Sequence, residues 1–241
     1  MRTSALIALT LPLAAAEPQA ADIVDSRLLD VLRGDGCPIC AVRARSEKAT
    51  MDAIINERVL DLGFRADLER KHGFCRRHVA ELVPTDRRET GGILGSSMLL
   101  SAVIDRRIDL VRGGIGSGSH RIRVRLGLAR DRPPCIACSQ GETAVATALA
   151  RLADRTSDAA WASVLAESPL CLDDFLLLCQ EAGSRPGFEP VARRQVERFE
   201  DLRRRLDGYA HHSSHDRIQL MTDEERTAAD EATRLLGGDG R

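Results

Sequence analysis

The chain has 241 residues, of which 43% are hydrophobic and 29% charged, and its net charge is −1. This composition excludes an intrinsically disordered chain and is typical of a globular protein large enough to bury a core. The balanced charge argues against nucleic acid or an anionic membrane surface as the main partner. No apolar run reaches the roughly 18 residues that a membrane-spanning helix needs.

The first 22 residues form either a signal peptide or a flexible extension. Arg2 is followed by an uncharged run from Ala5 to Ala16 that has the form of a short signal peptide with an Ala-x-Ala cleavage site. Pro12 interrupts this run, and the cysteine pattern described below suits thiolates kept reduced. We therefore predict a cytoplasmic protein, or an exported one if this segment is a signal peptide.

The rest of the chain has mainly helical periodicity. Apolar residues recur at helical spacing in five places: Ile39 to Leu60, Leu100 to Val111, Val145 to Leu152, Trp161 to Leu165 and Phe199 to Leu206. The pattern predicts an all-α protein.

Turn-forming residues and capping residues suggest where these helices begin and end. Pro84 and Asp86 are predicted to separate one helix from the next, and the Thr222-x-x-Glu225 capping box is predicted to open a last helix that ends at Gly237. The glycine- and serine-rich run at 113–119 predicts a hinge. The alternating stretch from Arg121 to Leu126 is a candidate short strand.

An internal repeat of cysteine motifs is the most informative feature. Cys37 and Cys40 form a CxxC pair, and 34 residues later comes Cys75-x-x-His78. A second CxxC pair, Cys135 and Cys138, is followed after 32 residues by Cys171-x-x-Asp174. The offset is 98 between the CxxC pairs (135 minus 37) and 96 between the downstream cysteines (171 minus 75). We therefore expect two related halves.

This spacing is typical of metal ligands. Donors three residues apart at a helix start can share one metal ion, and the helix N-terminus favours the thiolate form that metals bind. We predict one site in each half: Cys37, Cys40, Cys75 and His78 in the first, and Cys135, Cys138, Cys171 and Asp174 in the second. Such closed sets of four donors are typical of structural zinc.

The second predicted site has a less usual donor set. Asp174 takes the place that His78 has in the first half, and a carboxylate is a rarer zinc ligand beside three thiolates. Asp173 is a competing donor, whereas Cys179 lies about 12 Å beyond Cys171 along a continuous helix and is expected to be a core thiol. One zinc ion is therefore expected, and whether a second is bound stays open.

Three other interpretations of the cysteines fit the sequence less well. Buried cysteines acting as small hydrophobic residues would not explain the repeat. Thiol–disulfide chemistry suits the Cys-Pro-x-Cys motif, but its usual strand–helix–strand context is not apparent. An iron-sulfur cluster usually crowds three cysteines into a short run, which this sequence lacks.

Two further groups of residues are weaker candidates. His211, His212 and His215 are more typical of a solvated helix end than of a metal site. The arginines between Arg121 and Arg132 form the best basic patch, but no aromatic residues lie among them as expected for nucleic-acid binding, so that function is disfavoured.

The ordered motifs CPIC at Cys37, GFCxxH ending at His78, CIAC at Cys135 and Cys171-x-x-Asp174 resemble an uncharacterised prokaryotic domain-of-unknown-function family. That family carries CPxC, GFCxxH, a second CxxC and a second CxxH, and the similarity extends over about residues 23 to 238. The resemblance implies a mostly helical fold and metal binding by these residues. Ile136 and Asp174 depart from the family pattern, both at the second site, and no activity is implied.

Together these features predict a helical bundle of two metal-organised repeats with a C-terminal helical extension. The predicted segments are an N-terminal extension at 1–22, the first repeat at 23–112, a linker at 113–134, the second repeat at 135–182 and the extension at 183–241. We expect a non-enzymatic, zinc-stabilised binding or adaptor protein with an unknown protein partner. The alternative is a thiol-based redox or metal-responsive protein that uses the CPIC and CIAC pairs and releases metal from the Asp174 site on oxidation.

Overall fold

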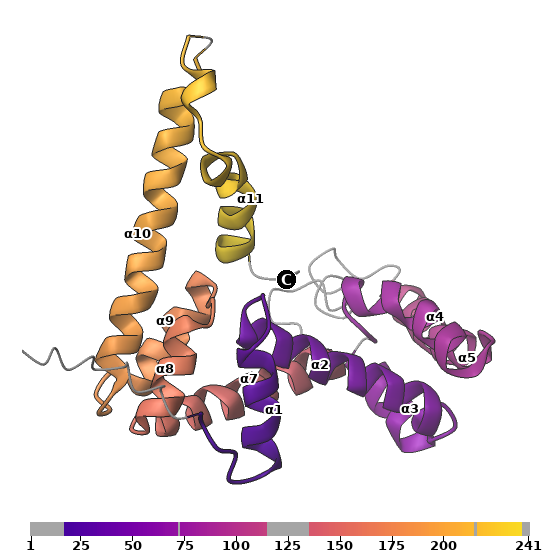
Figure 1. The fold of residues 1–241 in the computed structure, drawn as a ribbon. Helices are drawn as coiled ribbons and strands as arrows, with labels where there is room; N and C mark the ends of the chain where they lie inside the picture. Colours follow the sequence, from indigo (N-terminus) through magenta and orange to yellow (C-terminus); the bar gives the residue numbers. More distant parts are fainter. Residues whose placement is uncertain (1–16, 72, 115–134, 215, 238–241) are drawn as a thin grey trace, which may run out of the picture. The chain divides into compact units, whose positions relative to one another are not determined.

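The computed structural model describes residues 17–71, 73–114, 135–214 and 216–237, and within these ranges it is helical, with no strand (Figure 1). This confirms the predicted all-α class. The predicted signal segment to Ala16, the candidate strand at Arg121–Leu126 and the basic patch lie outside the described residues. None of the described helices combines the length and apolar character needed to cross a lipid bilayer.

The helices group into two compact units. One, here called the central unit, is Pro38–Ala150; the other, the split unit, combines Met1–Cys37 with Arg151–Arg241. The compact units therefore do not coincide with the two cysteine-bearing halves of the sequence. The split unit brings together segments from near both ends of the chain.

The central unit contains α2 (Pro38–Ala53), which continues into a π-helical turn, η1 (Ile54–Arg58), followed by α3 (Leu62–Arg70), α4 (Arg76–Thr90) and α5 (Leu94–Gly114). Most of α7 (Ile136–Arg155) also belongs to it. Its hydrophobic core is built mainly from aliphatic side chains, and Cys135 and Ala137 at the start of α7 join this core. The beginning of α7 is thus fixed by packing.

The predicted helix boundary at Pro84 and Asp86 is wrong, because α4 continues through both residues to Thr90. A proline inside a helix costs about 3 kcal/mol, but the surrounding turn is well packed, with Leu82 and Asp86 fully buried. The helix instead ends at Gly91, whose φ of 74° is the left-handed conformation that glycine adopts readily. Asp86 accepts a hydrogen bond from the backbone N–H of Ser96 at 2.7 Å, which caps the first turn of α5.

The split unit contains α1 (Ile23–Leu32), α8 (Ala159–Glu167), α9 (Leu172–Ala182), α10 (Phe188–His212), a 3₁₀ turn, η2 (Ile218–Leu220), and α11 (Asp223–Gly237). The long helix α10 packs against α8, and α11 lies beside it (Figure 1). The predicted capping box is confirmed: Thr222 N–H donates to Glu225 Oε2 at 2.9 Å, and Glu225 N–H donates to Thr222 Oγ1 at 3.2 Å.

A buried carboxylate joins α1 to the last turn of α7. Asp25 is fully buried and accepts hydrogen bonds from Ala21 N–H at 3.0 Å and from Arg151 Nε at 2.9 Å. Arg155 forms a second ion pair with it. Burial alone would raise the pKa of Asp25, but these donors and charges outweigh burial and hold the pKa below its ordinary value of 3.8.

Candidate metal centres

All eight predicted ligands lie in two groups of four. One group, here called the histidine cluster, is Cys75, His78, Cys135 and Cys138; the other, the aspartate cluster, is Cys37, Cys40, Cys171 and Asp174. In each group the candidate ligand atoms all lie within 4.8 Å of one another. Both sets are therefore compact enough to surround a single ion.

The structure combines the motifs differently from the sequence prediction. We expected each CxxC pair to meet the downstream motif of its own half, which would place Cys37 and Cys40 with Cys75 and His78. Instead, the second CxxC pair joins Cys75 and His78, and the first CxxC pair joins Cys171 and Asp174. The predicted pairing within each half is thus wrong, although each cluster still combines one CxxC pair with one downstream motif.

The direction of two helices explains this crosswise pairing. In the central unit α2 and α7 run in opposite directions where they touch. Ser46 Oγ donates to the carbonyl oxygen of Gln140 at 3.1 Å, and Arg43, earlier in α2, pairs with Glu142, later in α7. Their N-termini, and hence their CxxC pairs, lie at opposite ends of this contact. The Cys75-x-x-His78 motif at the start of α4 contacts the middle of α2, where Arg77 pairs with Glu47. Glu47 lies about 15 Å along the helix from Cys37. The motif therefore meets the start of α7, not the start of α2.

A glycine allows α2 and α7 to approach closely at this point. A Cβ atom on Gly141 of α7 would lie 2.9 Å from both Cγ and Oε1 of Glu47. That separation is shorter than normal contacts allow, so a side chain here would displace Glu47. Gly141 therefore matters for the geometry around the histidine cluster, although nothing in its sequence context marks it.

Each ligand pair lies at the start of a helix. Cys75 is the N-cap residue of α4 and Cys171 is that of α9, while α2 begins at Pro38 and α7 at Ile136. The second donor of each pair follows one turn later, on the same side of its helix. At the start of α4, backbone N–H groups of His78 and Arg77 stabilise negative charge on Cys75 and help to lower its pKa against the opposing effect of burial.

The approach to Cys75 requires glycine. Gly73 has a φ of +80°, and a Cβ atom there would lie 2.9 Å from Cγ1 of Val103 in α5. Phe74 is buried in the core of the central unit beside this turn. The Gly73-Phe74-Cys75 sequence thus has a local explanation: glycine makes the turn, phenylalanine anchors it and cysteine faces the cluster.

The distances within the histidine cluster fit a tetrahedral site. His78 Nδ1 lies 3.2 Å from the sulfur of Cys75, 3.2 Å from that of Cys135 and 3.4 Å from that of Cys138. The sulfur of Cys138 is 3.3 Å from that of Cys135 and 3.7 Å from that of Cys75. A tetrahedron with zinc–ligand bonds of about 2.0–2.3 Å has edges of about 3.5–3.8 Å, so the cluster is slightly tighter than this ideal.

The other ring nitrogen of His78 faces carboxylates. His78 is fully buried, and its Nε2 lies 3.6 Å from Oε2 of Glu47 and 4.0 Å from a carboxylate oxygen of Glu81. Glu47 is itself held by Arg77, whose Nη2 donates to both carboxylate oxygens at 2.8 and 2.7 Å. Nε2 makes no hydrogen bond to the described residues, so Glu47 acts on the ring through its negative charge, which favours a proton on Nε2. Nδ1 then presents its lone pair to the thiols.

The electrostatics of the histidine cluster suit a cation. Burial lowers the pKa of His78, which favours the neutral ring that a metal requires. Burial opposes ionisation of Cys75, but hydrogen bonds from the His78 backbone and from neighbouring thiols outweigh it and lower its pKa. Burial and the neighbouring Cys135 and Cys75 raise the pKa of Cys138 to about 12. Negative charge on neighbouring thiolates thus opposes ionisation of Cys138, and a divalent cation would relieve that repulsion.

The aspartate cluster is more deeply enclosed. Asp174 Oδ2 accepts hydrogen bonds from the thiols of Cys37 at 3.3 Å and Cys171 at 3.0 Å, and all four members of the cluster are buried. Asp173, the competing donor, is exposed and belongs to neither cluster. The half-buried Cys179 also lies outside both clusters, and burial raises its pKa.

The weaker histidine candidates have other contacts. His212 Nδ1 lies 3.0 Å from Oε2 of Glu225, close to the capping box of α11, and His211 lies beside Arg217. Neither belongs to a candidate metal group in the described part of the chain. His215 lies outside the described residues.

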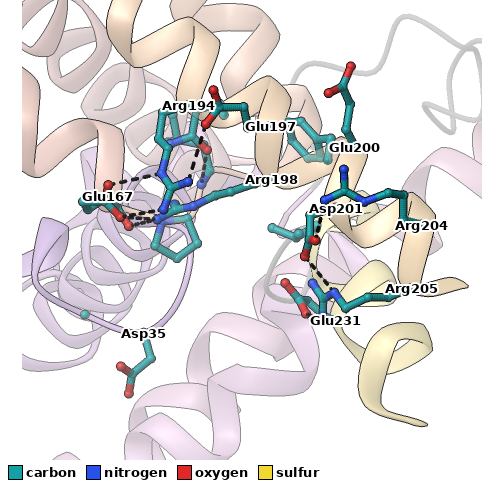
Figure 2. Close-up of a pocket in the computed structure, with 16 residues that line it drawn as sticks. Asp35, Glu167, Arg194, Glu197, Arg198, Glu200, Asp201, Arg204, Arg205 and Glu231 are labelled. Atoms are coloured by element: carbon teal, nitrogen blue, oxygen red, sulfur yellow. Dashed lines mark hydrogen bonds and ion pairs between the residues drawn. The ribbon is translucent and has the colours of Figure 1, made fainter. Parts of the chain in front are cut away.

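A pocket in the split unit is lined largely by charged side chains from α10 (Figure 2). Its arginines are matched by carboxylates: Arg194 Nε lies 3.2 Å from Glu167, and Arg205 Nη1 lies 2.7 Å from Glu231. The lining holds four arginines and six carboxylates, a small acidic excess, and these ion pairs neutralise much of the charge on its wall.

Sequence reasoning missed the groups that surround the ligands. Glu47, Glu81 and Arg77 bear on His78, but they occur among many other charged residues on helices. Arg77 lies between Cys75 and His78 in the motif, which placed it near the site without indicating its partner. Only the packing of α2 against α4 reveals that partner.

Comparison with known proteins places this site in a family. Residues 22–204 match DUF6062, a family of unknown function. The chain belongs to this family. The matched region includes both clusters and ends within α10, so the capping box and α11 lie beyond it. No curated protein and no solved structure matches the chain.

Proposed function

We propose that this DUF6062 chain is a non-enzymatic, zinc-stabilised helical protein that acts as a binding module or adaptor for a protein partner. The observation that carries the proposal is the crosswise gathering of four donors, within 4.8 Å of one another, from motifs that are 57 or more residues apart in each cluster. The two sets would bind one ion each, through Cys75, His78, Cys135 and Cys138 and through Cys37, Cys40, Cys171 and Asp174.

The donor types favour zinc. Three thiolates with one imidazole form a common structural zinc site, and a carboxylate oxygen is an acceptable fourth ligand. A cluster of several iron atoms would hold its cysteines further apart, because two or more metal ions lie between them. Donor atoms within 4.8 Å of one another suit a single ion.

The closed donor sets favour a structural role over a catalytic one. Catalytic zinc normally has three protein ligands and keeps the fourth position for water or substrate. Here each cluster offers four protein ligands. The ions would then hold helix starts together, as at the histidine cluster, where α4 would be joined to α7.

The expected energetic contribution is large. Structural zinc contributes on the order of 10 kcal/mol or more to the folding of small zinc domains. The net stability of a typical domain is only about 5–15 kcal/mol. Loss of either ion should therefore unfold the helices that it joins, not merely loosen a side chain.

An exposed apolar stripe supports a binding role. Ile104, Ile108 and Val111 follow one another at helical spacing on α5, and their exposed fractions are 55%, 40% and 45%. The sequence pattern predicts an amphipathic helix here, and α5 is present, but among the described residues this face stays exposed. Contiguous exposed apolar surface is more typical of interaction sites than of inert surface.

Two experiments test the structural-zinc proposal. Elemental analysis of the untagged protein should give two zinc equivalents, falling to one in Cys75→Ser and to one in Cys171→Ser. Cobalt-loaded protein should show a tetrahedral thiolate spectrum that does not change when azide is added, because no exchangeable position is available. An azide-dependent spectrum would indicate an open, catalytic-type site, and metal-free protein with full helicity would contradict the proposal.

A further inference from the structure

The two clusters differ in how exposed their ligand residues are. All four members of the aspartate cluster are buried, whereas Cys75 and Cys138 of the histidine cluster are only half-buried. The sulfur atoms of this half-buried pair are 3.7 Å apart, the longest of the cluster distances given above. The Cys75–Cys138 edge of the histidine cluster is therefore its more exposed, open edge, while the other two donors, His78 and Cys135, are buried.

The open edge leads directly to a pair of cysteines that can be joined. Cys138 lies on this edge, and its sulfur is 3.3 Å from that of the buried Cys135. A disulfide requires about 2.05 Å between the sulfur atoms, so a movement of little more than 1 Å would form it. The Arg77 guanidinium, which is partly exposed and interacts with Cys138, places a positive charge beside the same sulfur.

We propose that the histidine cluster is an oxidant-sensitive zinc site, whereas the aspartate cluster retains its ion. This inference rests on the proposed function in that it requires zinc at both clusters. The Cys138 thiolate attacks one oxygen of a hydroperoxide, the O–O bond breaks, and an alkoxide or hydroxide leaves with a proton taken from water. The Cys135 thiolate then attacks the Cys138 sulfenic acid, forming the disulfide and expelling hydroxide, which is also protonated. Two electrons pass from the sulfur atoms to the peroxide.

Formation of this disulfide would remove two of the four donors. Cys75 and His78 alone hold zinc far more weakly, so the ion leaves and α4 is no longer joined to the start of α7. This reverses the expectation from sequence, in which the unusual Asp174 ligand marked the weaker site. Burial decides the order of reaction, because an oxidant must reach a thiolate before it can react with it.

The test follows zinc release from the full-length, zinc-loaded chain treated with hydrogen peroxide. All proteins carry Cys179→Ser, since Cys179 is a half-buried thiol outside both clusters that would confuse the thiol count. A chromogenic zinc dye reports release, and peptide mapping identifies the disulfide. Cys171→Ser isolates the histidine cluster, and Cys75→Ser isolates the aspartate cluster.

We expect one of the two zinc ions to be released as two thiols are lost and a Cys135–Cys138 disulfide forms. Reduction of this disulfide should restore zinc binding. The Cys171→Ser protein should release its zinc at the same rate, and the Cys75→Ser protein should retain its zinc. Mapping of the parent protein gives an independent result if a variant folds poorly. Simultaneous release of both ions, release from the aspartate cluster first, or release without this disulfide would overturn the inference. A protein that contains no zinc at the outset would instead overturn the proposed function itself.

Discussion

Replacement of Glu47 by glutamine should weaken zinc binding at the histidine cluster and leave the aspartate cluster unchanged. Glutamine preserves the volume of a side chain that is only 7% exposed, but it removes the negative charge 3.6 Å from His78 Nε2. The ring would lose the carboxylate that favours a proton on Nε2 and a lone pair on Nδ1. The substitution therefore acts on the metal through His78, without touching a metal ligand.

The structure indicates that the effect on metal affinity should exceed the effect on folding. Loss of a carboxylate behind a histidine ligand typically lowers metal affinity about 10- to 100-fold, which corresponds to about 1.4–2.7 kcal/mol. The ion pair between Glu47 and Arg77 contributes less, because the Arg77 side chain is 38% exposed. Partly exposed pairs of this kind are worth about 0.2–1 kcal/mol.

The assay is competition for zinc with a chromophoric chelator, carried out in a Cys171→Ser background so that only the histidine cluster reports. Glu142→Gln is the matched control. It makes the same chemical change in an ion pair between α2 and α7, but the Glu142 side chain is 65% exposed and does not face His78. Equal zinc affinities for the Glu47 and Glu142 variants would refute the role assigned to Glu47.

Three further predictions concern packing, charge and capping. Gly141→Ala should displace Glu47 and so lower zinc retention at the histidine cluster. Gly92→Ala is the control and should not lower it, because the nearest atom to a Cβ at Gly92 is 3.8 Å away. Elemental analysis after dialysis distinguishes the two variants. Asp25→Asn should reduce the free energy of unfolding by about 1.5–3 kcal/mol at neutral pH, as expected for buried hydrogen bonds to a charged group. The folded-state pKa of Asp25 is lowered, so its contribution to the free energy of unfolding is complete above the ordinary pKa of 3.8 and is lost as the pH falls through the folded-state pKa. Denaturant titrations of wild type and variant should therefore give converging stabilities below the folded-state pKa. Thr222→Ala should destabilise α11 by about 1 kcal/mol without changing zinc content, and hydrogen exchange of the α11 amides measures this; unchanged protection would count against the cap.

The helices and the ligand residues could be predicted from sequence because both depend on local spacing. Apolar periodicity predicts the helices that follow Pro38 and Ile136, and donors three residues apart indicate shared sites whichever motif completes them. Pro84 shows the limit of a local rule, since buried neighbours keep α4 continuous through it.

The pairing of the motifs could not be predicted in the same way. Similar offsets of the cysteines, 98 and 96 residues, describe a duplication, but they do not say whether α2 and α7 run parallel or antiparallel. That direction depends on contacts between distant residues, such as Ser46 with Gln140 and Glu47 with Gly141. Once the two helices are antiparallel, the start of each lies far from the start of the other, and each CxxC pair meets the downstream motif of the other half.

Zinc stoichiometry in two double variants tests the crosswise arrangement most directly. Cys37 and Cys75 belong to different clusters, so the Cys37→Ser, Cys75→Ser protein should retain no zinc after dialysis against a weak chelator. Cys75 and Cys138 share a cluster, so the Cys75→Ser, Cys138→Ser protein should retain one equivalent. The opposite result, one equivalent in the first protein and none in the second, would mean that each half of the chain binds its own ion and would contradict the account.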